Sequence, residues 1–286
     1  MNTYKKSTYI NLAKEVVDAF KELPAVEAIA LGGSQAFNSV DECSDIDLYV
    51  FSDEKIPFQS RQKIVENLRV RKSDLNLTFW DLGDEWFDAR TGIEVDIIYW
   101  DKSWIIEQID RVLVSQQANV GYTTCLWFTV LNSKIMYDRD GWFAQLQNRC
   151  EQPYPEKLRN AIIARNHPVL RNVIPSYYNQ IKKAIHRDDY ISINHRIAAL
   201  FASYFDVLFA INCLPNPGEK KVLEHVLTKC SKIPEDFTSQ AEAVFKSVTG
   251  NCEKLLANLD VLLNSLDNLL IDEGINPART LELDTP

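Results

Sequence analysis

The sequence lacks any continuous apolar run of the roughly 18 residues that a membrane-spanning helix needs. It also lacks an apolar signal core at its start and any CxxC pair. None of its six cysteines lies near the four histidines at a spacing typical of metal sites. We therefore expect a cytoplasmic protein with reduced, mostly buried thiols and without a membrane partner.

Positive charge is also scarce, with 31 Lys and Arg residues against 40 Asp and Glu residues and a net charge of −9. A long nucleic acid needs a basic surface, so it is not expected as a partner. An acidic protein is better suited to a small cationic molecule. A local basic groove is still compatible with an acidic total.

Strand and helix patterns divide the chain near residue 150. Before it, apolar or alternating runs predict strands at 26–33, 44–51, 75–80 and 93–100, and helical spacing predicts helices at 9–23, 58–70 and 102–114. After the proline-containing "EQPYPEK", long amphipathic patterns predict helices at 192–214 and 243–271. The sequence thus predicts an α+β fold, with a mixed sheet flanked by helices over 1–150 and an all-α helical bundle over 151–286.

The first predicted strand ends in "GGS", at Gly32, Gly33 and Ser34. Glycines allow the backbone to turn sharply and to approach a ligand closely. The N–H groups of such a turn, followed by a helix start, bind anions, and the serine hydroxyl adds a donor. We therefore expect a phosphate-binding turn at these three residues.

The next strand starts with "DID", which puts Asp45 and Asp47 on one face because side chains alternate along a strand. Two adjacent carboxylates repel unless a cation lies between them, and a divalent ion bound to phosphates supplies that charge. A third acid is expected from "IEVDIIYW", where Glu94 and Asp96 share a face. Asp96 lies in a strongly apolar strand, where a charge needs a metal or a polar partner. A phosphate turn beside a carboxylate pair that binds Mg²⁺ indicates phosphoryl or nucleotidyl transfer.

The Gly-Gly-Ser turn, the ten residues after it and the Asp-Ile-Asp strand start together resemble the nucleotidyltransferase superfamily. That superfamily is typified by DNA polymerase β and kanamycin nucleotidyltransferase, and the resemblance covers roughly residues 25–140. It implies that the turn binds the triphosphate and that Asp45 and Asp47 are paired metal ligands, with Asp96 as the third acid. The helical C-terminal half resembles the substrate-binding bundles attached to many small bacterial members.

The resemblance implies the transfer of a nucleoside monophosphate from a nucleoside triphosphate to a hydroxyl of a small, cationic, antibiotic-like acceptor. ATP is the expected donor, and Mg²⁺ is the expected cofactor. Either Asp96 or Glu94 accepts the proton of the attacking hydroxyl, and the sequence leaves both open. In the C-terminal half, Lys182, Lys183 and Lys220 are expected to contact the phosphates.

A regulatory role is the alternative, in which an antitoxin-type nucleotidyltransferase modifies or binds a protein partner. The fused helical half favours the small-molecule enzyme, because stand-alone antitoxins of this class are usually short. A tRNA-directed enzyme is a third option, which the acidic charge disfavours. The sequence leaves the acceptor and the oligomeric state open.

Overall fold

The structure is a computed structural model in which residues 3–32, 45–250 and 252–284 are described. The chain divides into two compact units, an N-terminal unit of Met1–Ile109 with Thr129–Gln152 and a C-terminal unit of Asp110–Phe128 with Pro153–Pro286. Across the described residues, no helix has both the length and the apolar character that crossing a membrane requires.

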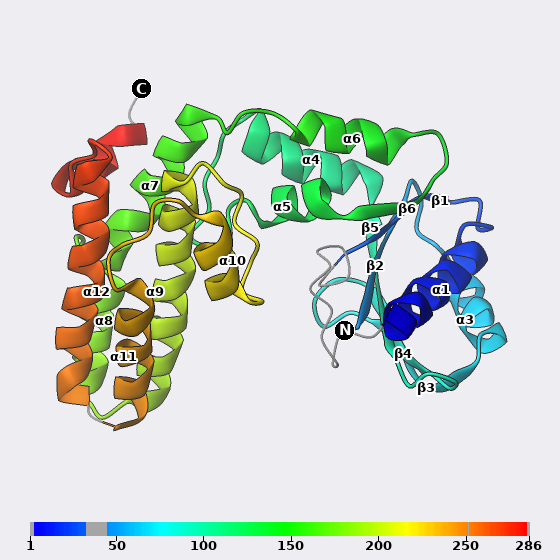
Figure 1. Cartoon of the computed structure of the whole chain (residues 1–286), viewed down its shortest axis with the longest axis horizontal. Coiled ribbons are helices and arrows are strands. Elements are labelled where there is room, and N and C mark those ends of the chain that lie inside the picture. Colours follow the sequence, from blue (N-terminus) through cyan, green and yellow to red (C-terminus); the bar gives the residue numbers. More distant parts are fainter. Residues whose placement is uncertain (1–2, 33–44, 251, 285–286) are drawn as a thin grey trace. The chain divides into compact units, whose positions relative to one another are not determined.

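The N-terminal unit is built on a mixed β-sheet, which among the described residues has six strands in the order β3-β4-β5-β2-β1-β6 (Figure 1). The strands are β1 Val26–Leu31, β2 Ile46–Ser52, β3 Val70–Leu77, β4 Gly83–Asp88, β5 Glu94–Asp101 and β6 Lys134–Asp138. The unit's helices are α1 Thr3–Phe20, α3 Phe58–Asn67 and α6 Trp142–Cys150, and α4 Lys102–Leu113 and α5 Cys125–Asn132 run across the unit boundary. Strands β2 and β5 are parallel, whereas all other neighbouring pairs are antiparallel. This mixed sheet with flanking helices confirms the predicted α+β fold.

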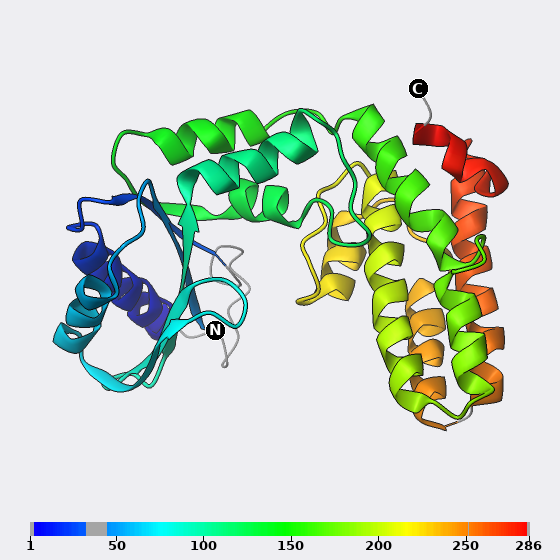
Figure 2. The same ribbon diagram turned by 180° about the vertical axis from the view of Figure 1, so that it is seen from behind.

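One face of the sheet is covered by α1 and α3, which lie side by side in both ribbon views (Figures 1 and 2). In α1, Leu12, Val16 and Phe20 recur at helical spacing and belong to one buried cluster with Leu48 of β2 and Ile97 of β5. Burying a side chain as completely as that of Phe20 contributes about 1.5–3 kcal/mol to stability. We call this side of the sheet the covered face.

The covered face also holds a buried ion pair. Nη1 of Arg61 in α3 donates to both carboxylate oxygens of Asp84 in β4, at 2.7 Å each. The Asp84 carboxylate also accepts hydrogen bonds from the Tyr99 hydroxyl and from the backbone N–H of Asn76, both at 2.7 Å. A buried charge is tolerated only with such partners. The pair therefore ties α3 to the β3–β4 hairpin.

The C-terminal unit is helical. Its elements are α7 Glu156–Leu170, α8 Tyr177–Ile185, α9 Tyr190–Ile211, α10 Val222–Lys229, α11 Phe237–Gly250, α12 Cys252–Asp272 and the 3₁₀ helix η1 Pro277–Asp284. Helix α9 packs against α7, α8 and α11. Its first half is amphipathic, with Ile193 and Ile197 buried, but every residue from Ser203 to Ile211 is buried. A helix that is buried on all sides is the centre of its core.

Residues 110–128 belong to the C-terminal unit because a polar network holds them there. The backbone N–H of Thr123 donates to the Asp206 carboxylate of α9 at 2.9 Å, and Asn216 Nδ2 donates to the same carboxylate at 2.7 Å. The backbone N–H of Gly121 donates to Asn166 Oδ1 at 2.8 Å. Burial raises the pKa of the Asp206 carboxyl, and these hydrogen bonds partly offset that effect. A boundary of functional domains at residue 150 stays a prediction; as compact units, residues 110–128 pack with the later helices.

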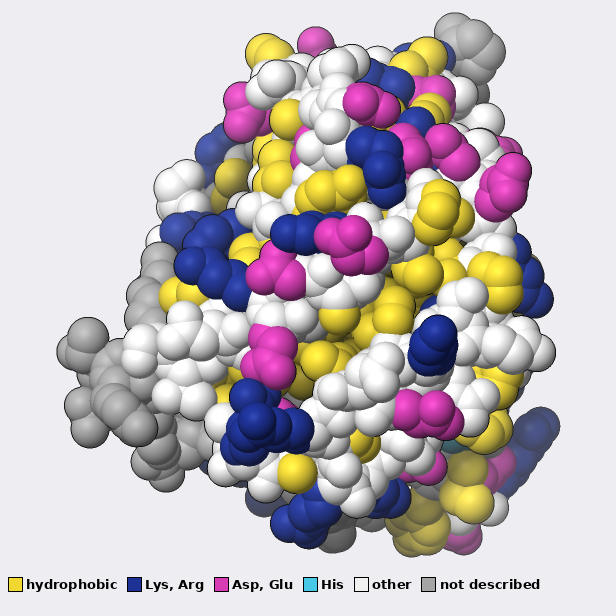
Figure 3. All heavy atoms as spheres, turned by 90° about the vertical axis from the view of Figure 1, so that its right-hand side faces the viewer, with side chains coloured by type: hydrophobic (Ala, Val, Ile, Leu, Met, Phe, Trp, Pro, Cys, Tyr) yellow, Lys and Arg dark blue, Asp and Glu magenta, His cyan; other side chains and the backbone are white. Residues whose placement is uncertain are grey.

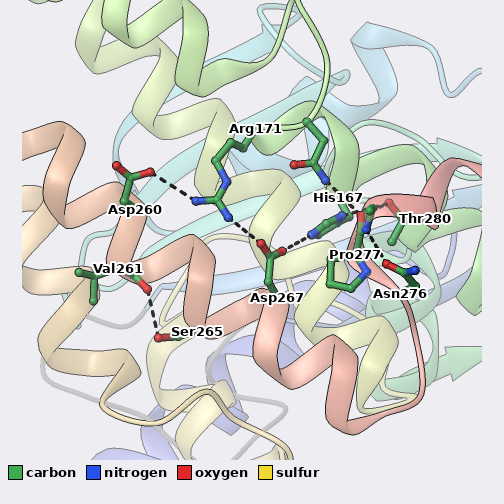
Figure 4. Close-up of polar contacts among 11 residues, drawn as sticks. His167, Arg171, Asp260, Val261, Ser265, Asp267, Asn276, Pro277 and Thr280 are labelled. Atoms are coloured by element: carbon green, nitrogen blue, oxygen red, sulfur yellow. Dashed lines mark hydrogen bonds and ion pairs between the residues drawn. The ribbon is translucent and has the colours of Figure 1, made fainter.

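Polar contacts also join α7, α12 and η1 (Figure 4). The His167 ring lies between Asp267 of α12, with Nε2 2.7 Å from Oδ1, and Thr280 of η1, with Nδ1 3.0 Å from the hydroxyl. Arg171 donates to the other Asp267 oxygen at 2.6 Å and to Asp260 at 3.3 Å. The order hydroxyl, imidazole, carboxylate resembles a nucleophile relay, but Thr280 is only 1% exposed and His167 3% exposed. No substrate reaches such a hydroxyl, so the cluster is structural.

Several predicted boundaries differ from the structure. The strand expected at 75–80 begins earlier, at Val70, and ends at Leu77, so the helix expected to reach residue 70 stops at Asn67. The helix expected at 243–271 is divided into α11 and α12. Strands β4 and β6 were not predicted. Their sequences, "GDEWFD" and "KIMYD", are short and contain charged residues or a glycine, which local patterns do not favour in strands.

Candidate functional site

Carboxylates from adjacent strands meet on the sheet face opposite the covered face. Asp47 of β2 is the direct register partner of Asp96 of β5. On the other side of β5, Asp96 is the direct partner of Glu85 of β4, and Glu85 is the partner of Asp74 of β3. Neighbouring strands are about 4.8 Å apart, so the row is closely spaced. We call this side the acidic face.

Strand alternation explains why these acids face away from the core. In β2 and β5 the residues that alternate with them are buried, whereas Asp47, Glu94 and Asp96 are half-buried. Asp45, directly before β2, is also half-buried. Burial raises the pKa of Glu94, and the negative charges of Asp45 and Glu85 raise it further. The acidic face thus has a strongly negative local potential.

Of the three residues of the predicted phosphate turn, only Gly32 is among the described residues. Gly32 directly follows β1, and its backbone N–H donates to the Asp47 carbonyl oxygen at 2.9 Å. This bond fixes the end of β1 beside the acidic row. Gly33 and Ser34 lie outside the described residues, so their contact with a phosphate stays a prediction.

Aromatic side chains occupy the other end of the acidic face. The Tyr49 ring of β2 stacks on Trp100 of β5, with centroids 4.6 Å apart and planes 7° from parallel. Phe51, the next residue on this face of β2, stacks on Phe143 of α6 at 4.6 Å. Burial raises the pKa of Tyr49, and the charges of Asp47 and Asp96 add to the rise, so the phenol stays protonated. The face therefore changes from half-buried acids to packed aromatic rings along each strand.

The donor chemistry of the acids fits a hard divalent cation, because carboxylate oxygens are the ligands that Mg²⁺ prefers. Asp47 and Asp96 are adjacent in register, and Asp45 directly precedes β2. Within the residues described, however, no group of three or more His, Cys, Asp and Glu side chains is placed to hold a metal ion. The ligand set of Asp45, Asp47 and Asp96 therefore stays a prediction that the carboxylate chemistry supports.

The three predicted phosphate-binding lysines all belong to the C-terminal unit and are exposed. Lys182 and Lys183 lie in the last turn of α8, which leads into the start of α9. Lys220 follows the far end of α9. Lys220 therefore lies in the connection between α9 and α10. Contact of these lysines with a triphosphate stays a prediction.

Two features near the acids were missed in the sequence. Glu85 continues the acidic row, but its strand was not predicted, so its register beside Asp96 had no basis in local pattern. Phe79 and Trp80, read as strand residues, lie instead in the β3–β4 connection and are 80% and 91% exposed. The next residue, Asp81, accepts a hydrogen bond from the Trp100 indole at 3.1 Å. Because Trp100 is on the acidic face, this connection borders that face.

The N-terminal part of the chain is similar to a known protein family. Residues 14–102, from α1 to the start of α4, match the family model described as "Polymerase beta, Nucleotidyltransferase". No curated protein is significantly similar in sequence.

Two solved structures are remotely similar. One is a nucleotidyltransferase-like protein from Exiguobacterium sibiricum 255-15, with 11% identity and a TM-score of 0.42 over 92% of this chain and 75% of that chain. The other is the STING-associated CdnE c-di-GMP synthase from Capnocytophaga granulosa, with 14% identity and a TM-score of 0.29 over 94% of this chain and 82% of that chain. At these TM-scores, neither likeness bears on the function of this chain.

Proposed function

We propose that the polymerase β-type nucleotidyltransferase domain formed by residues 14–102 transfers a nucleoside monophosphate from a nucleoside triphosphate to a hydroxyl of a small cationic acceptor. The domain makes the chain a nucleotidyltransferase; the donor, the cofactor and the acceptor are parts of the proposal. ATP is the proposed donor and Mg²⁺ the proposed cofactor.

The observation that supports the proposal most directly is the register of Asp47 beside Asp96 on a half-buried sheet face. Like charges directly opposite each other destabilise a sheet. In a nucleotidyltransferase domain, two carboxylates in this register are suitably placed to bind a divalent cation together.

In the proposed reaction, the acceptor hydroxyl oxygen forms a bond to the α-phosphorus, and the bond to the pyrophosphate oxygen breaks. The carboxylate of Asp96 or Glu94 accepts the hydroxyl proton, and pyrophosphate leaves with the electron pair of the broken bond. Asp45, Asp47 and Asp96 would hold Mg²⁺, which when bound neutralises phosphate charge and acidifies the attacking hydroxyl. Raising the pKa of Glu94 makes its carboxylate a stronger base.

The acceptor class follows from charge. Glu85 extends the negative row beyond the proposed metal ligands, and Asp74 follows it on β3, where it forms an ion pair with Lys72 at 3.4 Å. These carboxylates favour ammonium groups over anions. On the side of the molecule shown in Figure 3, Lys and Arg side chains are interspersed with Asp and Glu, whereas a long nucleic acid needs clustered positive charge.

The test is a transfer assay with each of the four radiolabelled nucleoside triphosphates, Mg²⁺ and pools of hydroxylated amines. We expect pyrophosphate release and a labelled product with the wild-type chain, and neither after chelation with EDTA. Asp53→Asn is the matched control, because Asp53 is an exposed aspartate directly after the far end of β2. It should behave like the wild type. If no triphosphate binds and no product forms with any pool, the proposal is wrong.

A further inference from the structure

Gly32 has no room for a side chain, and the cause is a neighbouring side chain. A Cβ atom on Gly32 would lie 2.2 Å from Cε2 and 3.0 Å from Cζ of the Tyr49 ring. Non-bonded carbon atoms stay about 3.5 Å apart or more, so any other residue would collide with the ring. Gly32 is not among the described glycines with positive φ, so its backbone conformation does not demand glycine.

The Tyr49 ring cannot give way easily, because Trp100 holds it by the stacking contact at 4.6 Å. Trp100 is itself fixed by the hydrogen bond from its indole to Asp81 and by the Trp104 ring at 5.7 Å. A well-packed ring of this kind moves only by disturbing its neighbours. The contact between Gly32 and Tyr49 is therefore a rigid one.

This contact joins the strand end of the predicted phosphate turn to the strands that carry the acids. Gly32 meets β2 twice, through its hydrogen bond to the Asp47 carbonyl oxygen and through the Tyr49 ring. Trp100 links the same ring to β5, four residues after Asp96. The stack thus spans the two strands of the acid pair and the end of β1.

We propose that Tyr49 is a positioning residue for nucleotide transfer: its ring sets the distance between the end of β1 and the acids Asp47 and Asp96. In this assignment Gly32 is a glycine because it receives the ring, and not because a phosphate needs close access to its backbone. The inference rests on the proposed function, since the geometry that the ring holds is that of the triphosphate site.

The two explanations for Gly32 differ in a double variant. A methyl group on Gly32→Ala should displace the ring and weaken Mg²⁺–triphosphate binding by about 10–100-fold, because small displacements of a site cost that much. Tyr49→Ala should weaken it comparably, because the spacing is lost. If the ring is what Gly32 accommodates, adding Gly32→Ala to Tyr49→Ala costs nothing further, within about twofold. If a ligand needs the space, the two losses multiply.

The experiment measures calorimetric dissociation constants for each of the four nucleoside triphosphates with Mg²⁺, and thermal unfolding without ligand, for the wild type, both single variants and the double variant. Tyr49→Phe keeps the ring and should restore most of the affinity lost in Tyr49→Ala. Phe20→Leu is the matched control: it disturbs packing on the covered face, on the other side of the sheet, so it should lower the unfolding temperature and leave the affinity unchanged.

Non-additive affinity losses, with Tyr49→Phe close to the wild type, would establish the positioning role. Multiplying losses in a chain that binds a triphosphate would overturn it while leaving the proposed function intact. If the wild-type chain binds none of the four nucleoside triphosphates, both the proposed function and the positioning role are wrong. An affinity loss in Phe20→Leu as large as that in Tyr49→Ala would show that Tyr49 acts only through general packing.

Discussion

Acidic side chains on the two faces of the N-terminal sheet have neighbours of opposite charge. On the covered face, Asp84 is fully buried against Arg61, and Asp88 at the end of β4 is bonded to Arg90 and Thr91. On the acidic face, the strand neighbours of Asp96 are Asp47 and Glu85. The pKa values agree: that of Asp88 is lowered, because its hydrogen bonds to Arg90 and Thr91 outweigh its burial, whereas that of Glu94 is raised.

The difference separates structural acids from functional ones. A buried acid with a guanidinium partner stabilises the native fold, since breaking the pair leaves an uncompensated charge. The acids of the acidic face instead have acids as register partners, an arrangement suited to binding a cation. Mutations on the two faces should therefore have opposite signatures in activity and stability.

The largest effect should come from Asp47→Asn. We expect transfer to fall by ~10³-fold or more, equivalent to about 4 kcal/mol of transition-state stabilisation. The apo protein should be as stable as the wild type or more stable, because one of two adjacent like charges is removed. Turnover and urea unfolding of the same preparations check both parts. If the variant unfolds, Asp47 is structural and its assignment to the site is wrong.

On the covered face, Arg61→Leu should lower the free energy of unfolding by about 3–5 kcal/mol, because Asp84 is left buried without its partner. Replacing both residues by apolar ones, Arg61→Leu with Asp84→Val, should recover most of that loss. Chemical denaturation of the two variants measures the difference. Equal stability of the single variant and the wild type would contradict a structural role of this pair.

Asp88→Asn should lower the free energy of unfolding by about 1.5–3 kcal/mol at neutral pH, the usual range for hydrogen bonds to a charged group. The folded-state pKa of Asp88 lies below the ordinary value of 3.8. Its contribution is therefore present above that pH and is lost as the pH falls through the lowered pKa. Unfolding measured from pH 7 to pH 3 should show the gap between variant and wild type narrowing at the acidic end. A gap that widens there would reverse the sign of the argument.

The smallest effect should come from Glu85→Gln, at the outer part of the acidic row. We expect the KM for a cationic acceptor to rise a few-fold, equivalent to roughly 0.2–1 kcal/mol, because the interaction is solvent-screened. Stability should change by less than about 0.5 kcal/mol. Steady-state kinetics over a salt series check this, with Glu66→Gln on α3 as the control. An unchanged KM at low salt would show that Glu85 does not contribute to acceptor binding.

The outward-facing positions of Asp47 and Asp96 could be predicted from the sequence, because the alternation of side chains along a strand is a local property. Asp45 and Asp47 are separated by one residue, and each of the two acidic strands has an apolar set opposite its acids. Glu85 could not be predicted, because its place beside Asp96 depends on the register of two strands joined by a turn. The predicted ligand set and the lysines stay predictions.

The sequence also could not predict why position 32 has no room for a side chain. Its neighbours in the sequence indicate a turn, which glycine favours through its backbone. The contact that excludes a side chain comes from Tyr49, a residue 17 positions later on another strand. Close packing between side chains distant in sequence leaves no signature in the local pattern.

Strand β6 has a consequence for the synthesis of the chain. It pairs with β1, but about a hundred residues separate the two strands, and residues 110–128, which pack with the C-terminal helices, lie between them. At a ribosomal rate of ~5–20 residues per second, β1 emerges several seconds before its neighbour. Residues 119–124 wait still longer, until Asp206 and Asn216 have been made. Residues 110–128 therefore stay without their packing partners until much of the C-terminal unit has been made, and truncating the chain at residue 150 leaves their polar network open.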